Sequence, residues 1–462
     1  MPKNLWFLTE ERPKKEVLQT IFQKFAKDYG FAVFLKPLHI QPILENNRFT
    51  FLYEVKGFDC KKVDKVYIKT ISGNSSLVDY LIFYQQDEPS SKDEPIYAIE
   101  ETKTDDKESR NTGVYQRCSK FVFIQSYYPN VKKIMLYNLQ IDQKIEPTST
   151  YIFGTKLLLT LGVEILGKKL NSKIFTPFKT IDEIIDLKND MRPAPKGNVP
   201  ILLTKSRTKI EVSGRLFKSG GLSHDPNIGA LSIICAVLRQ LGWTQKIEIT
   251  QHGLEQQHVG KTNKFIQIAN KLGICLQGLA LPKAEMNKNY WRYDTGGEKL
   301  GTIFIHLVVE NFTQGESIFE NHAGCEKGYF ITKSGDPIPL EKYKDREKYK
   351  GGDKEQIVHI PDLILIDFGR SEVINVEGKK YAFRKNGITE LGNYNYIEKN
   401  YILKHYPKFK ILRTVVLYGS TKEEIIEIEI GFLLNENGQL ILGVKAPKLF
   451  KDAITNLLDF WN

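Results

Sequence analysis

The chain has 462 residues, of which 41% are hydrophobic and 26% are charged, and its formal net charge is +11 at pH 7. This length exceeds one ordinary hydrophobic core, so two or three domains are expected, and the composition excludes a largely disordered chain. The basic balance favours a polyanionic partner, with nucleic acid before an anionic membrane.

The five cysteines are odd in number and form no C-x-x-C pair. This argues against a disulfide framework and a zinc ribbon, and it suits a reducing cytoplasm. His322 and Cys325 have the spacing of metal ligands, but no second pair completes a site, so an ordinary loop histidine and a small apolar cysteine are expected. Residues 1–15 lack the apolar segment of a signal peptide and no apolar run approaches bilayer length, which predicts a soluble cytoplasmic protein without a membrane partner.

Periodic apolar residues predict the elements of the N-terminal third. Helices are expected over residues 14–29 and about 112–127. Strands are expected over residues 49–55, 66–71, 77–83, 96–103 and 133–137. Residues 14–137 therefore contain a helix, four strands, a helix and a strand, which include the order helix, three strands, helix, strand.

Residues 192–200 form the clearest linker, because their prolines block both helix and sheet. Beyond it, helices predicted over about residues 226–241 and 262–272 bracket a strand at 247–250, a layout that resembles a helix-turn-helix or winged-helix unit. Side chains that can contact bases or phosphates gather around this unit: Arg207, Lys209, Arg215, Gln251, His252, Gln256, Gln257, Lys261, Asn263 and Lys264. An ordinary solvated helical face remains an alternative, because helical spacing distinguishes only core from surface.

In the C-terminal third, strands are predicted over residues 362–367, 373–379 and 414–418, with a helix over about 394–405. A hairpin at residues 426–444 and a closing helix at 449–461 are also expected. The charged stretch 336–353 is expected to be a surface excursion.

The residues most suggestive of chemistry lie on these C-terminal strands. Asp362 opens the first strand, and Glu377 and Lys379 close the second. Side chains alternate along a strand, so Glu377 and Lys379 share one face, and a hairpin would bring Asp362 towards it. Such a group can hold a hard cation, with Asp362, Glu377 and the Gly378 carbonyl as ligands and Lys379 positioning the attacking water.

The N-terminal strands repeat this arrangement. Asp79 opens one strand, Glu101 and Lys103 close the next, and the Thr102 carbonyl takes the role of Gly378. Glu100 is expected to face away from that second metal site. An aspartate followed by Glu-x-Lys also arises by chance in a lysine-rich chain, and a strand ending in solvated charges has the same pattern.

Both segments match the PD-(D/E)xK pattern, and the layout resembles a type II restriction endonuclease of the PD-(D/E)xK nuclease superfamily. The resemblance rests on residues 79–103 and 362–379 with their flanking elements, and Val78 stands where the pattern has proline. It implies an α/β fold of mixed α+β type. Two mixed-sheet nuclease modules, residues 1–190 and 286–462, would flank a recognition region at residues 200–285.

The resemblance further implies sequence-specific, Mg²⁺-dependent hydrolysis of double-stranded DNA, one strand per active site, with Mn²⁺ as a substitute. A monomer is expected, because two non-identical sites need no two-fold symmetry, and a cognate DNA methyltransferase is the expected genetic partner. No nucleotide cofactor is expected, since residues 162–169 have phosphate-loop spacing without its Ser or Thr. The alternatives are a homodimer with only the C-terminal site active, a non-catalytic DNA-binding protein on the same scaffold, and a Holliday-junction or repair nuclease, which the recognition-like middle region disfavours.

Overall fold

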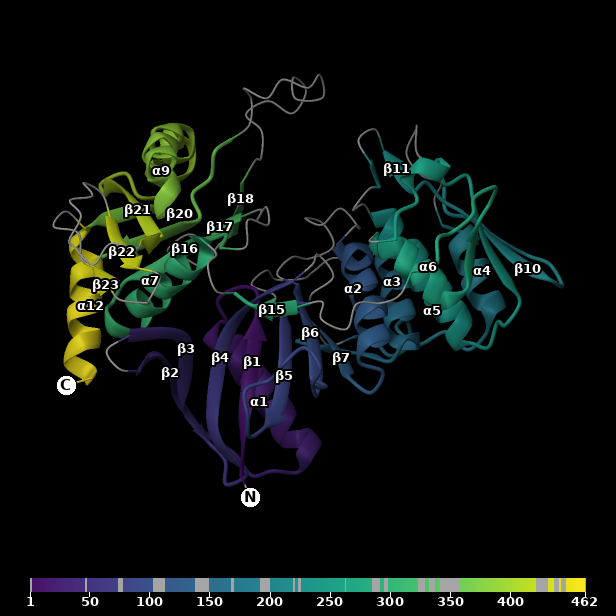
Figure 1. Ribbon diagram of the computed structural model, residues 1–462, viewed down its shortest axis with the longest axis horizontal. Helices are drawn as coiled ribbons and strands as arrows, with labels where there is room; N and C mark the ends of the chain where they lie inside the picture. Colours follow the sequence, from purple (N-terminus) through teal and green to yellow (C-terminus); the bar gives the residue numbers. More distant parts are fainter. Residues whose placement is uncertain are drawn as a thin grey trace. The chain divides into compact units, whose positions relative to one another are not determined.

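The computed structural model describes residues 2–45, 48–73, 78–102, 113–137, 149–167, 170–191, 200–218, 221–222, 226–261, 263–284, 291–294, 298–322, 329–331, 337–340, 358–420, 431–435, 440–441 and 446–461. The chain forms two compact units (Figure 1). Unit 1 comprises Met1–Ser72, Gln85–Asp87 and Tyr293–Asn462. Unit 2 comprises Gly73–Tyr84 and Glu88–Arg292. The predicted linker residues 192–199, most of the predicted excursion at 336–353, and Cys325 lie outside the described residues.

The N-terminal part of unit 1 is a twisted sheet with one helix. Its strands follow the order β2-β3-β4-β1. The elements are β1 (Lys3–Thr9), α1 (Lys15–Tyr29), β2 (Phe34–Glu45), β3 (Arg48–Asp59) and β4 (Val63–Gly73). Helix α1 forms as predicted, because its apolar residues recur on one face, and it ends at Gly30, whose φ of 65° suits glycine.

The C-terminal part of unit 1 is a six-stranded mixed sheet in the order β16-β19-β20-β21-β22-β23. Its elements are α7 (Glu298–Phe312), β16 (Glu316–Glu320), β19 (Leu363–Asp367), β20 (Glu372–Lys380), β21 (Lys410–Ser420), β22 (Gly431–Asn435), β23 (Leu440–Ile441) and α12 (Lys448–Trp461). A ribbon, β17 (Tyr329–Ile331) and β18 (Pro337–Pro339), accompanies them. Strands β16, β19 and β20 pair antiparallel in turn, whereas β21 runs parallel to β20.

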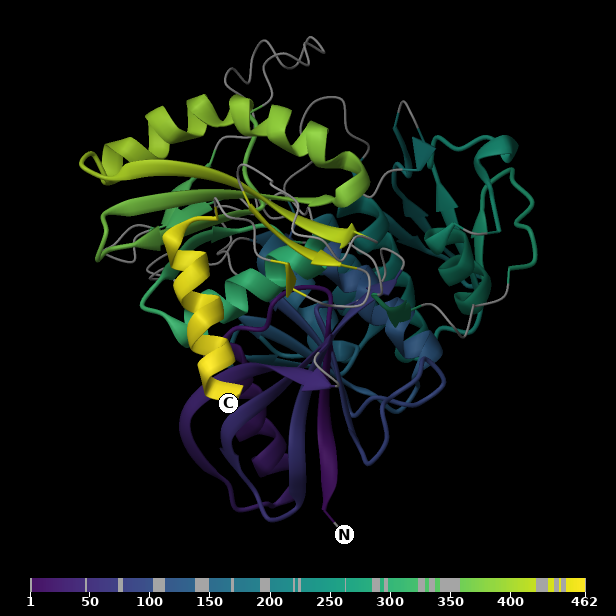
Figure 2. The same cartoon turned by 60° about the vertical axis from the view of Figure 1, so that its left-hand side comes forward.

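A broken helical segment joins β20 to β21 and covers one face of this sheet, while α7 and α12 lie on the other (Figure 2). The segment contains a short 3₁₀ turn (Tyr381–Phe383), α9 (Arg384–Leu391), a second 3₁₀ turn (Gly392–Tyr394), α10 (Asn395–Ile397), a π-helical turn (Glu398–Ile402) and α11 (Leu403–His405). The order α7, β16, β19, β20, helical segment, β21 is therefore helix, three strands, helix, strand.

Unit 2 contains a sheet in the order β5-β6-β7-β8, in which β5 and β6 are antiparallel and β7 and β8 follow in parallel. Its elements are β5 (Tyr80–Gln85), β6 (Tyr97–Thr102), α2 (Gly113–Tyr127), β7 (Lys132–Tyr137), α3 (Ser149–Thr160), β8 (Val163–Leu166) and α4 (Ile181–Asn189). The short strand β15 (Trp291–Tyr293) lies at the boundary between the two units.

The region expected to be a winged helix is instead a small α/β layer within unit 2. Its elements are β9 (Leu203–Lys205), β10 (Lys209–Ser213), α5 (Pro226–Gln240), β13 (Lys246–Thr250), a 3₁₀ turn (Gln256–His258), α6 (Lys264–Leu272) and β14 (Ile274–Leu276), beside the ribbon β11 (Phe217–Lys218) and β12 (Gly221–Leu222). Strands β10, β13 and β14 are parallel, and α5 and α6 connect them in turn. The winged-helix prediction is therefore wrong: both helices were found, but each is a crossover between parallel strands.

The grouping of residues also differs from three consecutive domains. One hydrophobic core runs from Phe121 through Ile184 to Leu276, and so joins residues on both sides of the predicted linker. Residues 1–72 belong with residues 293–462. The coarse expectation of a mixed α/β fold is confirmed. Within the described residues, no helix combines the length and apolar character needed to cross a bilayer.

Candidate active sites

The C-terminal site forms where β19 begins beside the end of β20. The antiparallel register pairs Leu363 with Val376, which places Asp362 opposite Glu377 on one face. The backbone N–H of Gly378 donates a hydrogen bond to Asp362 Oδ2 at 2.8 Å. The register of β19 and β20 thus places the predicted carboxylates of Asp362 and Glu377 side by side.

Lys379 completes this cluster. Its Nζ lies 2.7 Å from Glu377 Oε1 and 2.9 Å from Oε2 of Glu390, a residue of α9. The hydroxyl of the buried Tyr394 donates to Glu377 Oε2. Glu377 is therefore held on one side by an ammonium and on the other by a phenol.

Crowding of negative charge in a poorly solvated place alters the protonation of this group. Burial raises the pKa of Asp362, against the hydrogen bond from Gly378 and the charge of Lys379. Burial also raises the pKa of Glu377, and the neighbouring Asp362 carboxylate adds to this rise. Burial opposes the charge of Lys379, but its bonds to Glu377 and Glu390 outweigh that effect and raise its pKa.

Helix α7 packs against the site at Gly378. The helix comes so close to the strand there that only glycine fits at position 378. A Cβ added to Gly378 would lie 2.6 Å from Thr302 Cγ2 and 3.2 Å from Asp362 Oδ2. Glu298, the first residue of α7, adds a further negative charge that raises the pKa of Asp362. The site is thus rich in carboxylates and leaves no room for a side chain on the strand between Glu377 and Lys379.

In unit 2, Asp79 sits at the corresponding place. It precedes β5, and its Oδ2 accepts the backbone N–H of Glu101 at 2.7 Å. The register pairs Tyr80 with Ile99, so the residue opposite Asp79 is Glu100. Glu100 therefore matches Glu377, and the expectation that Glu100 faces away is corrected.

Glu101 and Glu100 accordingly have different partners. Tyr80 donates its hydroxyl to Glu101 Oε2 at 3.2 Å, on the other face of β6. Lys120 of α2 places its Nζ 2.9 Å and 3.0 Å from the two oxygens of Glu100. Lys103 lies outside the described residues, and of Thr102 only the backbone is described.

The predicted DNA contacts separate into two places. Residues 251–261 and Asn263 follow the carboxyl end of β13, and Arg215 follows the carboxyl end of β10, so these residues lie along one edge of the parallel sheet. Arg207 and Lys209 lie at the opposite edge, where Lys209 pairs with Glu211 and, at 3.4 Å, with Glu248.

Several of the predicted contacts serve the fold itself. His252 is 7% exposed, and its two ring nitrogens bond the Gln277 carbonyl and the Leu254 N–H, so it is not a surface base reader. The Asn263 side chain caps α6, and Gln256 is tied through its amide to the backbone of Ala280. Lys264 Nζ lies 5.9 Å from the centre of the Phe123 ring. The exposed candidates at the carboxyl edge are Arg215, Gln251, Gln257 and Lys261.

Glu390, Tyr394 and Lys120 are not predicted as site residues, because each lies in a helical segment outside the strand motif. A second missed feature braces the helical segment against the sheet. The buried carboxylate of Glu398 accepts from Asn375 Nδ2 at 2.7 Å and from Arg413 Nε and Nη2 at 2.7 and 2.6 Å. A buried asparagine in an apolar strand was the available sequence signal for such a partner.

Comparison of the chain with protein-family models, with curated proteins and with solved structures finds no match.

Proposed function

We propose that the chain is a Mg²⁺-dependent endonuclease that hydrolyses phosphodiester bonds of double-stranded DNA at a specific sequence. The observation that most supports this proposal is the convergence of Asp362, Glu377 and Lys379 at adjoining strand ends. A type II restriction enzyme of the PD-(D/E)xK kind is the proposed class. It also accounts for the order helix, three strands, helix, strand.

The donor set of the C-terminal site fits a hard divalent cation. Burial raises the pKa values of the Asp362 and Glu377 carboxylates, and repulsion from Asp362 raises that of Glu377 further. A bound divalent cation would supply the positive charge that stabilises both carboxylates in their ionised form. These two side chains and the Gly378 carbonyl would hold Mg²⁺, or Mn²⁺ in its place. The bound ion would supply Lewis-acid activation and offset the charge that develops on the phosphate.

Lys379 acts in this proposal as a fixed positive charge. Its raised pKa keeps the ammonium protonated at neutral pH, so it donates hydrogen bonds and does not remove a proton from water. It can orient the attacking water or contact a non-bridging phosphate oxygen once it exchanges its bond to Glu390. Tyr394 meanwhile fixes the orientation of the Glu377 carboxylate.

A second site in unit 2 is proposed from Asp79, Glu100 and Lys120. Asp79 and Glu100 share one face by register, and the Lys120 ammonium reaches Glu100 from α2. Lys120 thereby supplies the charge that the spacing had assigned to Lys103. With one site in each unit, a single chain has the groups needed to cut both strands without dimerising.

Sequence recognition is proposed for the carboxyl edge of the parallel sheet in unit 2. Ligands of open α/β sheets bind outside the carboxyl ends of the strands, where loops present their side chains. The exposed Arg215, Gln251, Gln257 and Lys261 lie there and offer donors and acceptors for base edges and phosphates. A cognate DNA methyltransferase remains the expected genetic partner.

Supercoiled DNA carrying many sequences, incubated with the chain in Mg²⁺ or in EDTA, tests the proposal. Linear fragments with uniform ends, formed only with Mg²⁺ and abolished when both Asp79→Asn and Asp362→Asn are present, are expected. Sequencing of the ends gives the target and the stagger of the cut. Intact DNA in Mg²⁺ alongside a stable gel shift would instead establish a non-catalytic DNA-binding protein.

A further inference from the structure

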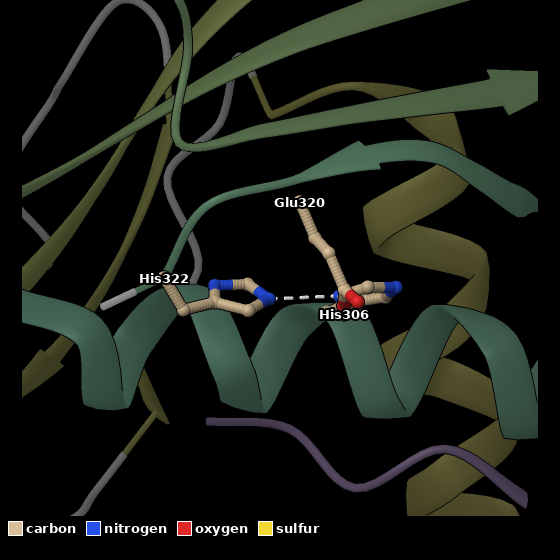
Figure 3. Close-up of side chains that lie close together, drawn as sticks. All are labelled: His306, Glu320 and His322. Atoms are coloured by element: carbon tan, nitrogen blue, oxygen red, sulfur yellow. Dashed lines mark hydrogen bonds and ion pairs between the residues drawn. The ribbon is translucent and has the colours of Figure 1, made fainter. Parts of the chain in front are cut away.

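Three polar side chains, His306, Glu320 and His322, lie close together at helix α7 in unit 1 (Figure 3). His306 projects from α7, Glu320 ends β16, and His322 follows in the next turn. All three side chains are buried, and one donor atom from each lies within 4.8 Å of the others. A buried histidine pair of this kind requires an account of where its protons lie.

The outer nitrogen of His306 is a donor. Its Nε2 lies 3.0 Å from Oε1 of Glu310, whose other oxygen lies 2.5 Å from Arg12 Nη1. A carboxylate paired with arginine is ionised and can only accept hydrogen bonds, so Nε2 of His306 carries the hydrogen. A neutral His306 ring therefore has its lone pair on Nδ1.

The direction of the Thr302 hydroxyl assigns the outer nitrogen of His322 as a donor as well. Its Nδ1 lies 2.9 Å from Thr302 Oγ1, and the Thr302 hydroxyl donates its own hydrogen to the Lys299 carbonyl at 3.1 Å. The threonine oxygen consequently accepts from Nδ1–H of His322. A neutral His322 ring therefore has its lone pair on Nε2.

These assignments bring two lone pairs face to face. Nδ1 of His306 and Nε2 of His322 are 2.8 Å apart, and Oε2 of Glu320 lies 3.6 Å from the same Nδ1. Two lone pairs at that distance repel unless a positive centre lies between them. These two separations lie on either side of the spacing of about 3.3 Å between ligands of a tetrahedral ion with bonds of about 2.0–2.1 Å, and all three donor atoms lie within 4.8 Å of one another.

We infer that His306, His322 and Glu320 bind a divalent transition metal of the zinc class. Imidazole nitrogens favour zinc and its neighbours over Mg²⁺, which separates this site from Asp362 and Glu377. Each ligand also has a partner of the kind that orients metal ligands: Glu310 on the outer nitrogen of His306, Thr302 on that of His322, and Arg12, whose Nε donates to Oε2 of Glu320 at 3.0 Å. A water would take the fourth position.

The position of the metal ties it to the first strands of the C-terminal sheet. Glu320 pairs with Leu363 in the sheet, and the N–H of Asn321 donates to the carbonyl of Asp362 at 2.6 Å. A metal that joins α7 to the end of β16 would therefore fix the strand end that presents Asp362. Its proposed role is to position the neighbouring carboxylate.

Titration of the chelator-stripped wild-type chain with Co²⁺, without DNA, tests the inference. We expect about one equivalent to bind with the intense visible absorption of tetrahedral Co²⁺, and Zn²⁺ to displace it. His306→Gln and His322→Gln should each weaken binding more than about tenfold, and Glu310→Gln, which changes only an outer partner, by about 10- to 100-fold. These measurements do not depend on DNA cleavage, so they test the metal site independently of the proposed nuclease function.

Two controls keep the test specific. His405→Gln changes an exposed histidine of α11, and Asp362→Asn changes the carboxylate site, and both should keep the Co²⁺ spectrum unchanged. Circular dichroism checks that each variant folds, and the wild-type and Glu310→Gln titrations decide the question if a histidine variant does not. A wild-type chain that binds neither Co²⁺ nor Zn²⁺ overturns the inference and leaves a proton shared between the two rings.

Discussion

Asp79 and Asp362 occupy equivalent places in two different sheets. Each precedes a strand, and each accepts the backbone N–H of the residue that follows the glutamate opposite it, at 2.7 and 2.8 Å. The strands that follow are also paired alike, first antiparallel and then parallel. The repetition therefore lies in the register and the strand order of the two sheets.

Removing one lysine should convert double-strand cleavage into nicking. Lys379→Ala removes the ammonium beside Glu377, and Lys120→Ala removes the one beside Glu100. We expect each to slow cleavage of one strand by about 10²- to 10⁴-fold, on opposite strands. Plasmid cleavage followed by mapping of the nicked strand measures this, with Lys385→Ala on the exposed face of α9 as the control that still yields linear DNA.

Two outcomes would change the arrangement of sites. If Lys379→Ala alone abolished cleavage of both strands, only the C-terminal site would be active, and the mass of the complex on cognate DNA should then be that of a dimer. Comparison of Lys103→Ala with Lys120→Ala shows which of these two lysines acts in the N-terminal site. If Lys103→Ala nicked DNA and Lys120→Ala kept full double-strand cleavage, Lys103 would be the lysine of the N-terminal site, as its spacing from Glu101 predicts.

Gly378→Ala should damage the C-terminal site through its backbone neighbours. The new Cβ would meet Thr302 at 2.6 Å and Asp362 Oδ2 at 3.2 Å. We expect unfolding to become easier by about 1–3 kcal/mol, as for other overpacked positions, and cleavage of one strand to fall at least about tenfold. Urea unfolding and strand-specific cleavage measure the two effects. Gly392→Ala is the matched control, because a Cβ there meets nothing within 4 Å, and it should leave both unchanged or slightly stabilise the chain.

Patterns along the chain locate elements but do not determine which strands pair. Strands β19 and β20 and helix α1 are predicted because alternation and helical period are local properties of the sequence. The choice between Glu100 and Glu101 depends on which residue of β5 lies opposite, and spacing within one strand does not contain that information. The parallel pairing of β10 with β13 is non-local in the same way.

Helix α7 escapes prediction for a different reason. Its residues from Leu300 to Val309 are all buried, so it lacks the polar face that gives an amphipathic helix its period. His306 therefore lies in a run without a recognisable pattern, and its proximity to His322 comes only from the fold. The expectation that His322 is an ordinary loop histidine misses this buried partner.

The raised pKa values of the site carboxylates predict how stability varies with pH. Burial raises the pKa of Asp362 to about 6 and that of Glu377 to about 8. Between the ordinary carboxyl range and pH 8 the folded chain then holds more protons than the unfolded chain, so without Mg²⁺ its stability should fall as pH rises across this window. Mg²⁺ binds the deprotonated carboxylates, and its stabilising effect should be larger at pH 8 than at pH 6.

Thermal melts at the two pH values, with Mg²⁺ or EDTA, measure this linkage. Glu377→Gln removes the group with the higher pKa, so its melting temperature should depend less on pH above 6 and respond little to Mg²⁺. A Glu377→Gln chain with the same pH dependence as the wild type would show that other groups control the titration.

Arg413 provides the last prediction, because its contacts hold the helical segment onto the sheet. Its guanidinium makes two hydrogen bonds to Glu398, at 2.7 and 2.6 Å, and a third to Asn395 Oδ1 at 2.6 Å. Arg413→Ala would leave the Glu398 carboxylate, 7% exposed, with Asn375 as its remaining described donor. We expect a loss of about 2–3 kcal/mol in the free energy of unfolding, since a buried charge loses its principal partner.

The effect should reach the site, since Tyr394 lies one residue before Asn395 and bonds Glu377. Cleavage by the C-terminal site is expected to fall in Arg413→Ala while cleavage by unit 2 is unaffected. Lys410→Ala on the same strand is the control: its ammonium lies 3.9 Å from Glu372 at a largely exposed position, so it should change stability by less than about 0.5 kcal/mol. Equal losses of unfolding free energy in the two variants would mean that the Arg413–Glu398 pair does not hold the helical segment on the sheet. An unchanged cleavage rate in Arg413→Ala would mean that this pair does not affect the orientation of Glu377.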